Sequence, residues 1–238
     1  MTAAVELIDI SVHRGGGPIV QGLSAVIAKA SWLGVVGANG SGKTTLLRAV
    51  AGRLPIASGR CMIEGADTAS DRSARARAVG FAPPIERLPS LLTIRTILEL
   101  AGEPIDAQQH RNEQLWRALG ITPLLERTIG DASSGMRQRA SIAVAFATPA
   151  SIVILDEPFN WLDPVAAFDT RAALAAQVAA GMTLITALHD LTTLCGFCER
   201  GIVLADGRAT LHLDTEELRA GERDARGFED NLIAALRR

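Results

Sequence analysis

A glycine-rich stretch ends in a lysine and a hydroxyl group: Gly37-Ala38-Asn39-Gly40-Ser41-Gly42-Lys43-Thr44. It has the spacing G-x-x-x-x-G-K-[ST] and separates an apolar, strand-like segment (32–36) from a helix-like one (43–54). In such a loop successive backbone N–H groups turn toward phosphate oxygens, and the helix directs its positive end to the same anion. The residues expected to hold a nucleotide are Gly37, Asn39, Gly40, Ser41, Gly42, Lys43, Thr44 and Thr45. Lys43 is the expected contact to the β- and γ-phosphates.

Two acidic residues, Asp156 and Glu157, follow the apolar run 151–155, which predicts a strand inside a parallel sheet. A carboxylate at the tip of such a strand can hold Mg²⁺ together with the Thr44 hydroxyl, so Thr44 and Asp156 are the predicted metal ligands. Glu157 is a candidate general base for the attacking water. Two acids after a strand are by themselves typical of an ordinary helix start. The phosphate loop favours the metal and catalytic interpretation.

The composition limits the class of protein that must position these groups. Hydrophobic residues make up 48% and charged residues 21% of the 238 residues, which is typical of a globular α/β protein. The formal net charge of −2 gives no bulk attraction to nucleic acid, so no nucleic-acid partner is expected. Three cysteines do not make a disulfide framework, which favours the cytoplasm. No apolar run reaches the ~20 residues of a membrane span, so a membrane role requires a partner.

Hydrophobic periodicity and turn residues predict the order of the elements. The expected strands are 3–12, 19–28, 32–36, 61–64, 79–82, 151–155, 183–188, 201–205 and 208–213. The expected turns are Gly15–Pro18 and Asp206–Gly207, and the expected helices are 43–54, 136–147 and 164–180. The region 91–128 is helical, with breaks at Pro104 and Pro123. The alternation predicts one α/β domain over 1–238, with a mostly parallel sheet, a helical subdomain at about 91–147 and a helical tail at about 215–238.

The segment "ASSGMRQR", 132–139, resembles the signature of the ATP-binding cassette (ABC) family. With the glycine loop, "LDEPFNWLD" and "ALHD", the likeness to its nucleotide-binding domain runs in order from about residue 5 to the tail. The resemblance implies a P-loop NTPase core with an N-terminal antiparallel β subdomain and an inserted α-helical subdomain. It also implies ATP and Mg²⁺ as cofactors.

The resemblance also implies roles for particular positions. Ser133 and Gly135 match signature residues that contact the γ-phosphate held by the other subunit. Asp163 matches the D-loop aspartate that works across the dimer interface, and His189 matches the switch histidine at the γ-phosphate. The catalytic set is therefore Glu157, His189 and Lys43. Because signature and phosphate loop face each other between subunits, a homodimer or heterodimer of ATPase subunits is expected.

Three positions depart from the family pattern. The chain has no Tyr, and the place of the adenine-stacking aromatic is taken by His13-Arg14. Either side chain could lie flat on the base, Arg14 through a cation–π contact, and a solvated turn is the alternative. Pro84 stands where the family has a glutamine that touches Mg²⁺ and the attacking water, with Glu86 nearby as a stand-in ligand or a plain surface acid. Ser134 replaces the first signature glycine.

The resemblance implies an ATP-hydrolysing subunit that powers transport by separately encoded transmembrane permease subunits. It would lie in the cytoplasm, peripheral on the inner face of the membrane. The compact helical insertion and the tail resemble ABC-2 exporter-type domains more than importer ATPases. Two alternatives remain: a soluble ABC ATPase acting on a protein scaffold, as in iron–sulfur cluster assembly, and a degenerate ATP-binding partner with weak hydrolysis.

Overall fold

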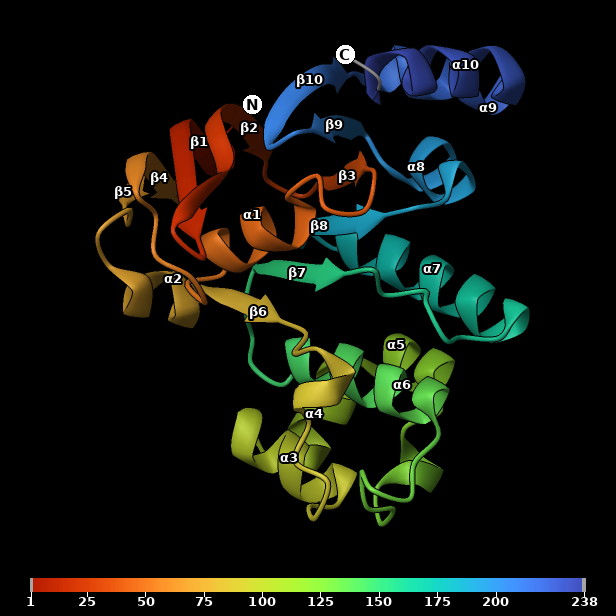
Figure 1. The fold of residues 1–238 in the computed structure, drawn as a ribbon. Helices are drawn as coiled ribbons and strands as arrows, with labels where there is room; N and C mark the ends of the chain where they lie inside the picture. Colours follow the sequence, from red (N-terminus) through yellow and green to blue (C-terminus); the bar gives the residue numbers. More distant parts are fainter. Residues whose placement is uncertain (1, 237–238) are drawn as a thin grey trace.

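The core of the protein is a six-stranded sheet, seen in a computed structural model that describes residues 2–236 (Figure 1). Its strands lie in the order β10-β9-β3-β8-β7-β6. Their bounds are Val79–Phe81 (β6), Ile152–Asp156 (β7), Thr183–Leu188 (β8), Trp32–Gly37 (β3), Arg200–Ala205 (β9) and Arg208–Leu213 (β10). All neighbours are parallel except β9 and β10, which form the predicted hairpin. Strand β8 is buried at every residue, as a parallel strand covered on both faces must be.

A second, antiparallel sheet contains the first two strands of the chain. Its order is β2-β1-β4-β5, with bounds Gly17–Ala28, Ala3–Arg14, Ser58–Ile63 and Ala66–Asp67. The predicted four-residue turn between β1 and β2 is too long, because β2 already begins at Gly17. The turn is Gly15-Gly16, whose φ values of 63° and 87° suit residues without a Cβ.

Helix α1 (Lys43–Val50) packs its apolar face between the two sheets, with Leu46 and Leu47 in a core cluster shared with β1, β2 and β3. The prediction that this helix continues to Leu54 was wrong. The chain turns at Gly52, where φ is 69° and a Cβ would lie 2.3 Å from the carbonyl oxygen of Arg72. Arg72 starts helix α2 (Arg72–Ala78), which the sequence did not predict.

The predicted helical insertion forms the lobe at the lower end of Figure 1. It consists of η1 (Ile85–Arg87), α3 (Ile94–Ala101), α4 (Ile105–Arg111), α5 (Glu113–Leu119), η2 (Thr122–Leu124) and α6 (Ser134–Ala145). Its buried side chains join one continuous core cluster with the strand residues Val153, Leu155 and Leu184. The lobe is therefore packed onto the sheet rather than tethered beside it.

The remaining helices are α7 (Pro164–Ala179), α8 (Leu191–Phe197), α9 (Thr215–Arg223) and α10 (Ala225–Leu236). Helices α9 and α10 lie at the end of the molecule opposite the helical lobe (Figure 1). Within residues 2–236, no helix combines the length and the apolar character that a bilayer crossing requires.

The sheet order brings three strand ends together. Strands β3, β8 and β7 are adjacent and parallel, so their carboxyl ends meet at one edge of the sheet. Gly37 ends β3, Asp156 ends β7, and His189 directly follows β8. Groups at the carboxyl ends of neighbouring parallel strands form the usual ligand site of α/β sheets.

Candidate active site

The glycine loop forms a compact turn between β3 and α1. Gly40 and Gly42 have φ values of 84° and 105°, in the left-handed region that favours glycine. The Nζ atom of Lys43 donates hydrogen bonds to the carbonyl oxygens of Gly37 (2.7 Å) and Ala38 (3.2 Å). The loop is thus closed by its own lysine, whose side chain is almost fully buried.

Two observations show that this loop fits a phosphate group. The hydroxyl of Ser41 is buried and has no hydrogen-bond partner among the described residues. Helix α1 begins after Gly42 with no side-chain cap, so its first N–H groups are available to an anion. Burial also lowers the pKa of Lys43 below its ordinary value, against the attraction of Glu157 and Asp156, which raises it. A phosphate would supply the negative charge that balances this buried ammonium.

The two predicted metal ligands touch each other. The Thr44 Oγ1 atom donates a hydrogen bond to Oδ1 of Asp156 at 3.2 Å. Both are hard oxygen donors, and their separation is close to the roughly 3 Å edge of an octahedron with bonds of about 2.1 Å, so the pair fits Mg²⁺. Burial raises the pKa of Asp156, and the hydrogen bond from Thr44 opposes this rise.

The side chain of Glu157 is hydrogen-bonded through both carboxylate oxygens. Its Oε1 lies 2.5 Å from Nε2 of His189, and its Oε2 accepts from Nδ2 of Asn160 at 2.8 Å. The backbone of Glu157 has a φ of 52°, a strained conformation for a residue with a side chain. Its N–H bonds to the carbonyl oxygen of Ala187 on β8 at 3.2 Å, which holds this conformation in place.

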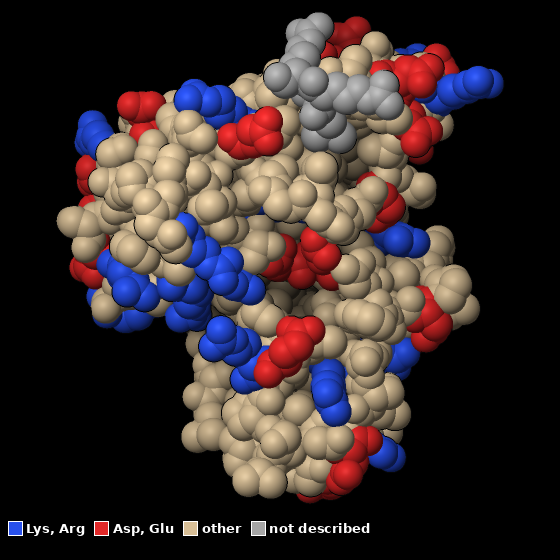
Figure 2. Space-filling model, in the orientation of Figure 1, with Lys and Arg blue, Asp and Glu red and all other residues tan. Residues whose placement is uncertain are grey.

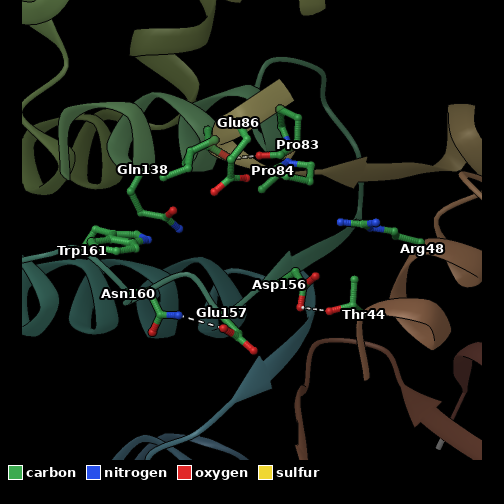
Figure 3. A pocket seen from close by; sticks show the side chains of 13 residues that line it. Thr44, Arg48, Pro83, Pro84, Glu86, Gln138, Asp156, Glu157, Asn160 and Trp161 are labelled. Atoms are coloured by element: carbon green, nitrogen blue, oxygen red, sulfur yellow. Dashed lines mark hydrogen bonds between the residues drawn. The ribbon is translucent and has the colours of Figure 1, made fainter. Parts of the chain in front are cut away.

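Thr44, Asp156 and Glu157 line one cavity of about 220 Å³ (Figure 3). Its wall also includes Arg48 of α1, Pro83-Pro84 and Glu86 next to β6, Gln138 of α6, Asn160 and Trp161. In Figure 2 this face of the molecule is hollowed at its centre, with acidic side chains in the hollow and basic ones gathered beside it. Pro84 and Glu86 therefore both lie where the missing glutamine was expected.

The predicted signature residues occupy a different surface. Ser133 caps α6, its Oγ accepting from the Met136 N–H at 3.3 Å, and Gly135 lies in the first turn of the helix. Neither residue lines the cavity that contains Thr44 and Asp156. Neither lines a second cavity, which lies beside His189 and Arg171. Within one copy of the chain, Ser133 and Gly135 therefore do not contribute to the cavity that Thr44 and Asp156 line.

Asp163 contacts both helix α7 and helix α6. It caps helix α7 by accepting from the N–H groups of Val165 (3.1 Å) and Ala166 (2.9 Å), and it pairs with Arg139 of α6 at 3.1 Å. These backbone hydrogen bonds lower the pKa of Asp163, and the bond from Ala166 has the largest effect. Arg14 is exposed at the end of β1, paired in register with Gly17, and lines neither of the two cavities.

Sequence reasoning missed several polar residues of the cavity, among them Arg48, Gln138, Ser141 and Asn160. Gln138 is almost fully buried and donates from Nε2 to the carbonyl oxygen of Pro158 at 3.1 Å, so it supports the turn after Glu157. Asn160 lies only three residues after Glu157 in "DEPFN". That spacing was a usable signal for a hydrogen bond to the acid.

This phosphate loop, set between a parallel strand and a helix with acids on a neighbouring strand, defines a nucleotide-binding P-loop protein. Comparison with known proteins narrows the class. Residues 20–160 match the family model described as "ABC transporter". The chain belongs to the ABC transporter family, as an ATP-binding subunit with ATPase activity.

Individual relatives agree with this assignment. The thiamine import ATP-binding protein ThiQ of Shigella flexneri serotype 5b is 32% identical over 207 residues, covering 85% of this chain and 89% of its own. The Nod factor export ATP-binding protein I of Rhizobium meliloti is 29% identical over 211 residues, covering 87% of this chain and 63% of its own. A solved ATP-binding subunit of an ABC transporter superposes with a TM-score of 0.84 over 99% of this chain and 100% of its own, at 24% identity.

Proposed function

We propose that the chain binds ATP with Mg²⁺ in the loop Gly37–Thr44 and hydrolyses it with Glu157 as the general base, to power transport through membrane subunits. Residues 1–238 would form one nucleotide-binding domain. The observation that supports this most is the hydrogen bond between Thr44 and Asp156, with Glu157 on the adjacent residue facing the same cavity. It brings together, from two segments, groups that triphosphate hydrolysis requires.

Each residue has a distinct part in this proposal. The N–H groups of the loop and of α1 hold the β- and γ-phosphates, and Lys43 exchanges its loop carbonyls for phosphate oxygens. Thr44 and Asp156 would hold Mg²⁺, which when bound neutralises charge that develops on the phosphates. Glu157 accepts a proton from the attacking water. His189 is expected at the γ-phosphate, and in this structure its Nε2 lies 2.5 Å from Oε1 of Glu157.

The proposal includes a dimer of ATPase subunits, either a homodimer or a heterodimer. Ser133 is exposed and Gly135 half-buried at the start of α6, and neither lines the cavity beside the phosphate loop of its own chain, so a second chain would hold the phosphate that they contact. A neutral hydroxyl and the N–H groups of a helix start suit that anion.

The membrane attachment is also part of the proposal. The chain would lie on the inner face of the membrane through transmembrane permease subunits, a proposal supported by its similarity to ATP-binding proteins of transport systems. The two relatives above are named for import and for export. The exporter type suggested by the compact insertion therefore stays a prediction, and co-purification from membranes with identification of the partner is its test.

The composite site has a direct test by subunit mixing. Lys43→Ala disables the loop of one copy, and Ser133→Arg blocks the signature surface of another. Each variant alone is expected to be inactive in Mg-ATP hydrolysis, and the mixture is expected to recover part of the activity, because one intact loop then faces one intact signature. Two inactive variants with an inactive mixture, or an active Ser133→Arg protein, would contradict the two-copy site. Glu157→Gln is the control that removes the base but keeps the loop.

A further inference from the structure

Asn160 and Glu157 belong to one tight turn. The backbone N–H of Asn160 donates to the carbonyl oxygen of Glu157 at 3.3 Å, and its side-chain amide donates to Oε2 of Glu157 at 2.8 Å. Figure 3 shows this amide directed at the carboxylate from the side of the cavity that carries Trp161. Two hydrogen bonds within one turn therefore link Asn160 to Glu157.

The other oxygen of Glu157 depends on a different element. Oε1 is bonded to His189, which follows β8, so this contact is made between two strand ends rather than within one turn. A histidine that turns toward a γ-phosphate must leave Oε1. The bond from Asn160 to Oε2 has no reason to break in that movement, because no other hydrogen bond of the Asn160 side chain competes with it within residues 2–236.

We propose that Asn160 is a positioning residue for hydrolysis: it holds Oε2 of Glu157 so that Oε1, once released by His189, faces the attacking water. Oε1 then takes a proton from that water, the water oxygen bonds to the γ-phosphorus, and the bond from phosphorus to the β–γ bridging oxygen breaks, giving ADP and phosphate. This inference rests on the function proposed above, and it deepens the account of the same site.

Glu157 needs such a restraint for a physical reason. A glutamate side chain has three rotatable bonds, and its backbone here is in the left-handed region, where it is not locked by a regular helix or strand. A displacement of about 1 Å at a reacting group can lower a rate by about 100-fold. A neutral amide fixes one oxygen by donating a hydrogen bond without neutralising the base.

Substitution of Asn160 separates positioning from folding, because the residue is exposed. Asn160→Leu keeps the size but removes the donor. It is expected to lower kcat by about tenfold, with KM for ATP within about twofold and an unchanged thermal midpoint. Asn160→Ser, which keeps a shorter donor, is expected to restore part of kcat. Asn231→Leu, at an exposed asparagine of α10, is the matched control with normal kcat.

The Glu157→Gln background completes the test. If Asn160 acts through Glu157, adding Asn160→Leu to Glu157→Gln lowers the residual rate no further. An Asn160→Leu protein with normal kcat, or one whose loss persists unchanged in the Glu157→Gln background, would overturn the inference while leaving the ATPase proposal in place. A wild-type chain that binds ATP without any turnover would instead remove the proposed function, and this inference with it.

Discussion

Gly135 lies so close to Trp161 that a Cβ atom on the glycine would be 2.7 Å from the carbonyl oxygen of the tryptophan. The contact joins the first turn of α6 to the loop between Glu157 and α7. The ion pair between Arg139 and Asp163 joins the same two segments one turn further along α6. The two contacts therefore connect α6 directly to the loop that follows the proposed base.

Gly135→Ala is expected to separate these two segments. The methyl group requires a shift of backbone, which costs about 1–3 kcal/mol of unfolding free energy and lowers ATPase turnover by at least about tenfold. Urea denaturation and steady-state ATPase assays measure the two effects. Gly196→Ala is the matched control: it lies on α8 with nothing within 4 Å of the added atom, and it should be neutral or slightly stabilising. Equal behaviour of the two variants would contradict the close contact.

Lys43→Ala is expected to weaken ATP binding by roughly 10- to 100-fold, since one charge-assisted contact is worth about 1.5–3 kcal/mol. The free energy of unfolding without nucleotide should change by less than about 1 kcal/mol, because the lost bonds to Gly37 and Ala38 are offset by relief of a buried charge. Isothermal titration with ATP and thermal unfolding test the two halves separately. A variant that binds ATP normally would refute the assigned role of the loop.

Asp156→Asn is expected to abolish Mg-dependent turnover and yet to raise the thermal midpoint of the nucleotide-free protein at neutral pH. Burial raises the pKa of Asp156, so its stabilising contribution is present at low pH and is lost as pH rises through that raised pKa. The neutral amide has no such loss. The difference in midpoint between variant and wild type should therefore shrink as pH falls. A difference that grows on acidification would contradict the burial effect.

Replacement of the buried Arg75 is expected to lower the free energy of unfolding strongly. This fully buried guanidinium has carbonyl oxygens as its hydrogen-bond acceptors, and it has no carboxylate within ion-pair distance among the described residues. The acceptors are the carbonyl oxygens of Ala49, Leu54, Thr68 and Ala69. Arg75→Met leaves these carbonyl oxygens without their donor and is expected to lower the free energy of unfolding by about 3 kcal/mol or more. Arg77→Met, exposed on the same helix, should cost less than about 0.5 kcal/mol in the same denaturation experiment.

The sequence was sufficient to predict the elements in which a hydrophobic pattern is followed by residues suited to the chemistry of the site. Strands β3, β7 and β8 are mostly apolar, and Gly37, Asp156 and His189 lie at or directly after their carboxyl ends, so the convergence at one sheet edge was predictable. The hairpin at Asp206-Gly207 was also predictable, because both residues tolerate positive φ.

Other features depend on packing that has no local signature. Helix α2 reads "RSARARA", with no apolar stripe, and its buried residue is an arginine, the type least expected in a core. The spacing in "DEPFN" allowed a hydrogen bond from Asn160 to Glu157, but no periodicity encodes the left-handed backbone of Glu157. The separation of Ser133 and Gly135 from the loop of their own chain likewise depends on how the helical lobe packs onto the sheet.

The bonds between Lys43 and the carbonyl oxygens of Gly37 and Ala38 have a consequence for product release. In the proposed cycle, the ammonium group would return to acceptors within its own loop when ADP departs, so no buried cation would be left without partners. The empty loop would then keep the shape that the next nucleotide needs, and repeated cycles would require no refolding of this segment. ATP would enter by exchange of oxygen acceptors, which would keep the gain in free energy modest enough for the spent nucleotide to leave.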